Sequence, residues 1–183
     1  VTLRDRRAAA ATERLLRAAV GLRAKYHADP HRPRYHFVPL TGWMNDINGP
    51  LYWNGRCHIF YQAEPHRIGR LGAHWGHASS VDLVHWVHYP PALAPSDDGP
   101  DRIGCFSGGM VANGGVPTAV YHGQPDGLCL ATSTDPELVR WTKHPANPVI
   151  RTNPPNLWHG SWFPPGWEQD PCAWGAEGRW YAL

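Results

Sequence analysis

The 183-residue sequence has few charges and no long run of one sign. Charged residues make up 17% of the chain, and the formal net charge is +2 with neutral histidines. Binding to nucleic acid relies on many cationic contacts with phosphates, so this composition argues against a nucleic-acid partner. No apolar stretch resembles a membrane span, so no membrane partner is expected either.

A secretory signal peptide is also lacking at the N-terminus. Residues 1–27 carry scattered arginines and no uninterrupted apolar stretch, which a signal peptide requires. We therefore favour a cytoplasmic location. A chain that starts at Val1 instead of methionine leaves a missing leader open.

Cysteines are few and far apart. Cys57, Cys105, Cys129 and Cys172 form no CxxC pair, whereas a zinc site needs close pairs or Cys/His spacing. We expect free thiols buried in strands, with two disulfides as the alternative.

The twelve histidines are scattered, and His74 with His77 is the closest suggestive pair. No third ligand stands at a matching spacing. The sequence therefore predicts neither a metal site nor another cofactor.

What the chain has in abundance is tryptophan, glycine and proline. There are 10 Trp, 19 Gly and 19 Pro. Many aromatic residues with dense turn punctuation favour a β-rich chain with exposed stacking surfaces. Carbohydrate is the partner that such surfaces commonly serve.

The chain changes texture after about residue 37. Before that point, Thr12 to about Lys25 shows apolar residues at helical spacing, which predicts a surface helix. After it, short apolar runs alternate with Gly, Pro, Asn and Asp clusters, as in a β protein. We therefore divide the chain into a helical extension, 1–30, and a β domain, 31–183.

The β region contains internal echoes. Ala78–Trp86 (ASSVDLVHW) is echoed by Ala131–Trp141 (ATSTDPELVRW), and Leu51–Tyr61 is echoed by Ala173–Leu183. Both members of the second pair read as a strand, a Gly-Arg turn and a strand. Between them, Cys105–Asn113 opens another strand.

These echoes predict a β-propeller. Asp46, Phe106 and Asp170 stand at equivalent blade starts, about sixty residues apart, somewhat longer than the roughly 40–50 residues of common propeller blades. The length after Asp46 suffices for two blades and the opening hairpin of a third. A ring of about 4–8 blades is usual, so we expect the chain to be truncated.

Six motifs occur in one order along the chain: WMNDINGP, HIFYQAEP, HWGHASSVDLVHW, CFSGGMV, the S-x-D…W-x-K…NPVI stretch and QDPCAW. In this ordered set the sequence resembles glycoside hydrolase family 32 over about Tyr35 to Leu183. That family contains invertases, fructanases and fructosyltransferases. The resemblance implies a five-bladed propeller followed by a β-sandwich, of which this chain would hold the first blades.

The resemblance implies hydrolysis of terminal β-fructofuranosyl bonds of sucrose or fructans with retention. Such an enzyme needs a carboxylate nucleophile beside the anomeric carbon. Asp46 matches that nucleophile, and Asp170 matches a second aspartate that binds ring hydroxyls and stabilises the transition state. Without the motifs, Asp46 would read as an Asx-turn and Asp170 as an Asp-Pro turn.

The resemblance also implies a set of sugar-contacting residues around the two aspartates. Trp75 in this set reads equally well as a core residue. The set is Trp43, Met44, Asn45, Asn48, Gln62, Trp75, Phe106, Ser107 and Gln169.

The chain departs from the family pattern at three points. Ile47 stands where proline is usual, and Gln169 stands where an arginine usually supplies a fixed cation. No glutamate is followed by cysteine, the pair that carries the family's general acid/base. We interpret this as truncation and expect the isolated fragment to be poorly soluble and nearly inactive.

Three alternatives remain open at this stage. Fructosyl transfer would use the same motifs, and a related five-bladed family acting on arabinosides is a weaker possibility. A fructoside-binding protein without catalysis would keep the pocket but not the acid, an idea that Gln169 favours.

Overall fold

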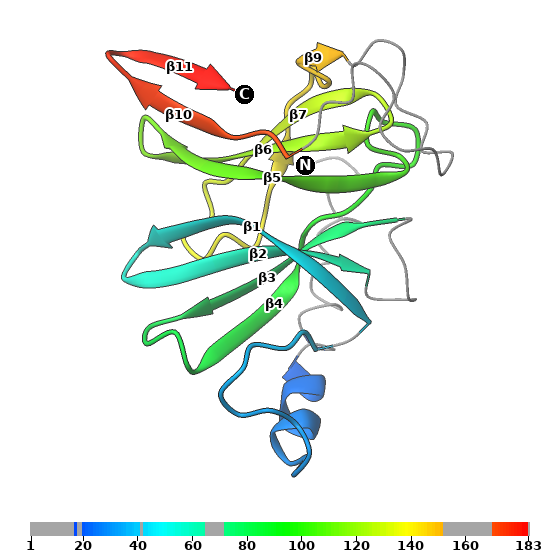
Figure 1. The fold of residues 1–183 in the computed structure, drawn as a ribbon, viewed down its shortest axis with the longest axis vertical. Coiled ribbons are helices and arrows are strands. Elements are labelled where there is room, and N and C mark those ends of the chain that lie inside the picture. The colour runs from blue at the N-terminus through cyan, green and yellow to red at the C-terminus, as the bar shows by residue number, and fades with distance from the viewer. Residues whose placement is uncertain (1–16, 18–19, 41, 65–71, 152–169, 183) are drawn as a thin grey trace.

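The structure is a computed structural model that describes residues 17, 20–40, 42–64, 72–151 and 170–182. These residues form two stacked antiparallel sheets and a two-stranded hairpin (Figure 1). The first sheet has the order β1-β2-β3-β4: β1 (Trp43–Trp53), β2 (Arg56–Glu64), β3 (His74–Ser80) and β4 (Trp86–Leu93).

The second sheet has the order β5-β6-β7-β8, and β9 also pairs with β7. Its strands are β5 (Gly104–Asn113), β6 (Val116–Gln124), β7 (Gly127–Thr132), β8 (Thr142–Lys143) and β9 (Ile150–Arg151). The hairpin consists of β10 (Ala173–Ala176) and β11 (Arg179–Ala182). Two blades and the start of a third confirm the predicted all-β partial propeller.

A helix precedes the first blade, as predicted, and it is observed over residues 20–27. It therefore ends slightly later than Lys25. Residues 1–16 and 18–19, where the predicted helix begins, lie outside the described residues. None of the described helical residues forms a segment long and apolar enough to cross a membrane.

The same tight turn joins the first two strands of each blade. Asn54–Gly55, Gly114–Gly115 and Glu177–Gly178 each place both residues at positive φ, between 47° and 80°. Two consecutive positive φ angles define a type I′ turn, whose twist matches that of the flanking strands. The predicted strand–turn–strand echo of residues 51–61 and 173–183 is thus a repeated hairpin.

The echo between residues 78–86 and 131–141 is a repeated turn that follows the third strand of the first two blades. Ser80 Oγ accepts from the amide of Asp82 (3.1 Å), and Ser133 Oγ accepts from the amide of Asp135 (3.1 Å). Each aspartate Oδ1 then accepts from the amide two residues further on. These side chains replace backbone partners within the turn, so the two blades bend in the same way.

The core lies between the two stacked sheets. Phe60 and Trp75 come from the first sheet, Tyr121 comes from the second, and Leu138 comes from the connection between β7 and β8; all four are fully buried. Trp75 and Tyr121 meet edge to face across the interface, with ring centroids 6.0 Å apart. Burial of these large apolar side chains provides the main attraction between the blades.

All four cysteines are free thiols, as expected. Cys105 and Cys129 are buried in strands, Cys57 is half-buried, and Cys172 is exposed ahead of β10. The expectation of burial therefore fails for Cys172, which belongs to the edge of the third blade.

A pair of histidines is buried inside the first blade. His58 Nδ1 lies 2.9 Å from His77 Nε2, and the His77 ring stacks between Phe60 and Tyr89, with centroids 4.6 and 4.5 Å away. Burial lowers the pKa of His58 to about 4, with a further contribution from Arg56. The pair therefore packs as neutral aromatic rings, which accounts for two of the scattered histidines.

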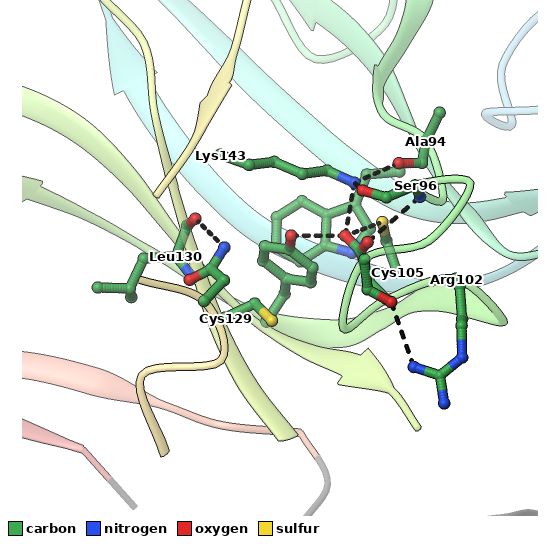
Figure 2. Close-up of polar contacts among 12 residues, drawn as sticks. Ala94, Ser96, Arg102, Cys105, Cys129, Leu130 and Lys143 are labelled. Carbon is green, nitrogen blue, oxygen red and sulfur yellow. Dashed lines mark hydrogen bonds and ion pairs between the residues drawn. The ribbon is translucent and has the colours of Figure 1, made fainter. Parts of the chain in front are cut away.

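A buried carboxylate fixes the chain where it enters the second blade. Asp101 is fully buried, and its Oδ2 contacts Lys143 Nζ at 2.5 Å and accepts from Tyr121 OH at 2.8 Å. Lys143 also donates to Ala94 O and to Ser96 Oγ, in the segment that joins the blades (Figure 2). One ion pair thus links β8 to the connection between β4 and β5.

The charges of this cluster set the protonation of its members. Burial raises the pKa of Asp101, but the Lys143 ammonium more than offsets this effect, and the pKa lies below its ordinary value. Burial raises the pKa of the Cys105 thiol well above its usual range. Asp101 is therefore charged and Cys105 is a protonated thiol that donates to it at 3.4 Å.

The cluster leads to a stability prediction. Asp101→Asn keeps the shape of the side chain but leaves the Lys143 ammonium without its counter-charge. We expect a loss of about 2–4 kcal/mol in the free energy of unfolding, somewhat below that of a fully buried pair because Lys143 is partly exposed. Urea unfolding of the variant measures this loss.

The neighbouring Arg102→Gln is the matched control, because it breaks the exposed pair with Asp126 (3.0 Å). An exposed pair contributes less than about 1 kcal/mol. Equal losses in the two variants would contradict the role given to Asp101.

Candidate active site

The first strands of the three blades lie side by side. Gly49 of β1 has φ +45°, and a Cβ added there would lie 2.5 Å from the Cβ of Met110 in β5. A Cβ added at Gly109 of β5 would lie 3.4 Å from the carbonyl oxygen of Pro171, just before β10. Glycine at position 49 lets β1 approach β5 closely, whereas the contact of Gly109 with Pro171 is an ordinary van der Waals distance. Residues at the start of each blade are thereby brought together.

A β-bulge interrupts β1 at its polar residues. Asn45 and Asp46 both lie opposite the single residue Gln62 of β2, so the register shifts there. A bulge of this kind redirects a side chain that regular alternation would aim elsewhere. The bulge explains why the turn-forming residues Asn45 and Asp46 occur within a strand.

The inner strand of the second blade carries the same bulge. Phe106 and Ser107 both lie opposite His122 of β6. The two inner strands therefore present a bulged pair at the same level of each blade. The sequence placed Asp46 and Phe106 at equivalent blade starts, but it did not reveal the bulges, because these depend on the pairing with β2 and β6.

A hydrogen-bonded chain crosses from one bulge to the other. Gln62 Nε2 donates to Ser107 Oγ at 2.6 Å, and Ser107 Oγ donates to Asp46 Oδ2 at 2.7 Å. Gln62 and Ser107 are both buried, whereas Asp46 is exposed. Among the described residues, Oδ1 of Asp46 has no hydrogen-bond partner. The carboxylate is thus held by one oxygen while the other faces outward.

Two of the residues predicted to contact the sugar are buried beneath the protein surface. Trp75 is fully buried, and its Nε1 donates to the carbonyl oxygen of Phe106 at 2.9 Å. Asn48 is 1% exposed, and neither of its amide atoms has a hydrogen-bond partner among the described residues. Trp75 supports the backbone of the second bulge from the core.

The other predicted residues that the structure describes lie on the inner strands β1 and β5 or next to them. Trp43, Met44 and Asn45 are half-buried on β1, and Phe106 is half-buried on β5. Asp170 is exposed with φ +54°, and Pro171, which follows it, packs against Gly109 of β5. Gln169 lies outside the described residues.

His122 is a residue that the sequence reasoning missed. It is 1% exposed, its Nε2 lies 2.9 Å from Gln124 Oε1, and its ring lies 6.2 Å from that of Phe106. It occupies the place in the second blade that Gln62 occupies in the first. The segments FYQAEP and VYHGQP contain the signal, since both run aromatic, polar, small, polar, proline.

The chemistry of this site rests on side-chain oxygens, amides and aromatic rings. Among the described residues, no group of three or more His, Cys, Asp or Glu side chains is arranged to hold a metal ion. His74 Nδ1 lies 2.6 Å from the carbonyl oxygen of Gly72, while His77 packs in the core of the first blade.

Comparison with known proteins gives a consistent result. The model of the glycosyl hydrolases family 32 N-terminal domain matches residues 36–183. The chain is 43% identical over 149 residues to a sucrose-6-phosphate hydrolase of Zymomonas mobilis, covering 72% of this chain and 29% of that protein. It is 41% identical over 150 residues to a raffinose invertase of Escherichia coli, covering 72% of this chain and 31% of that protein.

Solved structures agree with these relatives. Fructan 1-exohydrolase IIa from Cichorium intybus matches with a TM-score of 0.66 and 35% identity, covering 85% of this chain and 29% of that one. A Bombyx mori β-fructofuranosidase mutant in complex with sucrose matches with a TM-score of 0.70 and 32% identity, covering 94% and 36%. The chain spans about a third of the length of the relatives that it matches.

The contact between inner strands leads to a second prediction. Gly49→Ala must both strain a positive φ and push β1 away from Met110. Gly55→Ala, at φ +77° in the β1–β2 turn, strains φ alone, because nothing lies within 4 Å of its added Cβ. We expect Gly49→Ala to cost about 1–3 kcal/mol more free energy of unfolding than Gly55→Ala.

Urea unfolding of both variants measures the difference. An equal loss in the free energy of unfolding for the two variants would show that β1 and β5 do not approach closely at Gly49.

Proposed function

The chain belongs to glycoside hydrolase family 32, and we propose that the protein hydrolyses terminal β-fructofuranosyl bonds of sucrose or fructans with retention of configuration. In this proposal residues 31–183 are part of the catalytic propeller, and residues 1–30 are an extension that precedes it. The relatives, which include an invertase, a β-fructofuranosidase and a fructan exohydrolase, support this class of substrate.

The observation that carries the proposal is the geometry of Asp46. Its Oδ2 accepts from Ser107, and its exposed Oδ1 has no hydrogen-bond partner among the described residues. A carboxylate nucleophile needs one oxygen free to attack and a fixed orientation for the rest of the group. The Gln62–Ser107 pair supplies that orientation from two different blades.

The reaction then proceeds in two displacements. Oδ1 of Asp46 attacks the anomeric carbon, the glycosidic C–O bond breaks, and the leaving oxygen takes a proton. Water next attacks the same carbon from the opposite face and gives a proton back to the group that protonated the leaving oxygen; the fructosyl ester bond breaks, and Asp46 is regenerated as a carboxylate. The proposal assigns no proton donor within the 183 residues, because none of their glutamates precedes a cysteine.

The remaining roles follow from position and from the family resemblance. Asp170, near β5, binds ring hydroxyls and stabilises the positive charge that develops on the sugar ring. Phe106 contacts the ring, and Trp43, Met44 and Asn45 line the approach along β1. Trp75 and Asn48 act from below the surface, as supports of the two bulged strands.

Substitution of the nucleophile tests the proposal. Asp46→Asn keeps the hydrogen bond from Ser107 but removes the negative charge that attacks, so we expect kcat for sucrose to fall by at least ~10³-fold. Asp98→Asn, an exposed aspartate between β4 and β5, is the matched control and should keep full activity. Release of glucose and fructose from sucrose is the measurement.

The products separate this proposal from its alternatives. Equal glucose and fructose support hydrolysis, whereas fructose-containing oligosaccharides made from sucrose alone indicate transfer. Retention requires that added methanol yields the methyl β-fructofuranoside. Sucrose binding by a full-length protein that shows no turnover would instead support a fructoside-binding protein and refute the hydrolase.

A further inference from the structure

A cavity of about 470 Å³ lies on the side of the first blade away from the inner strands. One wall is the N-terminal segment between Arg23 and Leu40, and the other is the start of β4 with His85, Trp86 and His88. Figure 1 shows the helix of residues 20–27 beside the β4 edge of the first sheet. None of the residues assigned to the proposed fructosyl site lines this cavity, so it is a separate feature.

Two arginines of the cavity wall, Arg23 and Arg32, are held by backbone or aromatic groups and not by acids. Arg23 Nη1 donates to the carbonyl oxygen of His88 at 3.0 Å. Arg32 Nη2 donates to the carbonyl oxygens of residues 38 and 39, each at 2.9 Å, and its guanidinium lies 4.9 Å from the ring centroid of Tyr26. Arg34 is exposed, and no described residue accepts a hydrogen bond from it. The cations are therefore partly positioned but not neutralised.

Acidic groups do not balance this charge. Of the described residues that line the cavity, Asp29 is the only acid, and its Oδ1 accepts from the amide of His31 at 2.9 Å. Asp82 lies nearby in sequence, but its carboxylate is engaged in the β3–β4 turn, where it contacts the His85 ring at 2.7 Å. Three arginines and one aspartate among the lining residues give the cavity an excess positive charge.

One of the four histidines that line the cavity, His88, lies close to these cations. Burial and the charges of Arg32 and Arg23 together lower the pKa of His88 to about 4. His88 is therefore neutral at pH 7, and its ring stacks on Phe37 with centroids 5.2 Å apart. The wall thus combines fixed cations with neutral aromatic surface.

We propose that this cavity binds the phosphate group of a small phosphorylated molecule, with Arg23, Arg32 and Arg34 as its cationic ligands. Guanidinium groups recognise phosphate through paired charge-assisted hydrogen bonds. A phosphate monoester carries about −1.5 to −2 charge at pH 7, close to the excess of arginines over Asp29. Phe37 and Trp86 offer apolar contact for the organic part of the ligand, as in other small-molecule sites.

Titration of the purified protein with phosphates tests the proposal. Isothermal calorimetry at constant ionic strength, with inorganic phosphate and with a hexose 6-phosphate, should give one saturable site, and the unphosphorylated hexose should give none. Arg34→Gln should weaken phosphate binding by about tenfold or more, because it removes a charged donor with no structural partner. Added chloride should weaken binding further, since the site is open to solvent.

The matched control is Arg151→Gln, which alters an exposed arginine on β9 away from the cavity. It should bind phosphate as tightly as the unmodified protein. Tighter binding of the hexose 6-phosphate than of inorganic phosphate supports contact with the aromatic wall, and equal binding supports recognition of phosphate alone. Absence of saturable binding, or an Arg34→Gln variant that binds as well as the control, would overturn the proposal.

This test is independent of turnover. Asp46→Asn should leave phosphate binding unchanged, because Asp46 is not part of the cavity. Failure of the fructosidase proposal would therefore not by itself affect the phosphate site, and the reverse also holds.

Discussion

The hydrogen bond from Ser107 to Asp46 is the contact on which the site depends. It joins the inner strands of two blades, at 2.7 Å, through groups that are 61 residues apart in sequence. Both oxygens of a free aspartate would otherwise rotate in solvent. Ser107 fixes one of them, and Gln62 fixes Ser107 in turn. A carboxylate with one immobilised oxygen and one exposed oxygen is suited to attack on a carbon in a defined direction.

The propeller is the framework that makes this contact possible. Glycine at position 49 lets β1 and β5 approach closely, and a bulge in each of these two strands brings its polar or aromatic pair to the same level. The buried Asp101–Lys143 pair holds the entry into β5, directly before Phe106 and Ser107. Stability and site geometry therefore depend on the same few junctions between blades.

Local signals allowed the hairpins and the blade count to be predicted from sequence, whereas the site residues came from the family resemblance and stay a prediction. Asn54–Gly55 and the paired Ser-x-Asp turns are short-range features, so the residues themselves determine their geometry. The bulge at Asn45–Asp46 was not predicted, because it depends on pairing with β2. His122 was missed although FYQAEP and VYHGQP share a pattern, and the register of β5 against β6 shows its equivalence to Gln62.

The role of Asp46 is tested most directly by trapping the covalent intermediate. The protein is mixed with sucrose, quenched in acid during turnover and digested, and the peptides are analysed by mass spectrometry. The account predicts that one fructosyl group is attached as an ester to the peptide that contains Asp46, and that this adduct is absent from the Asp46→Asn variant. A fructosyl adduct on Asp170 or on any other residue, formed while sucrose is being cleaved, would contradict it.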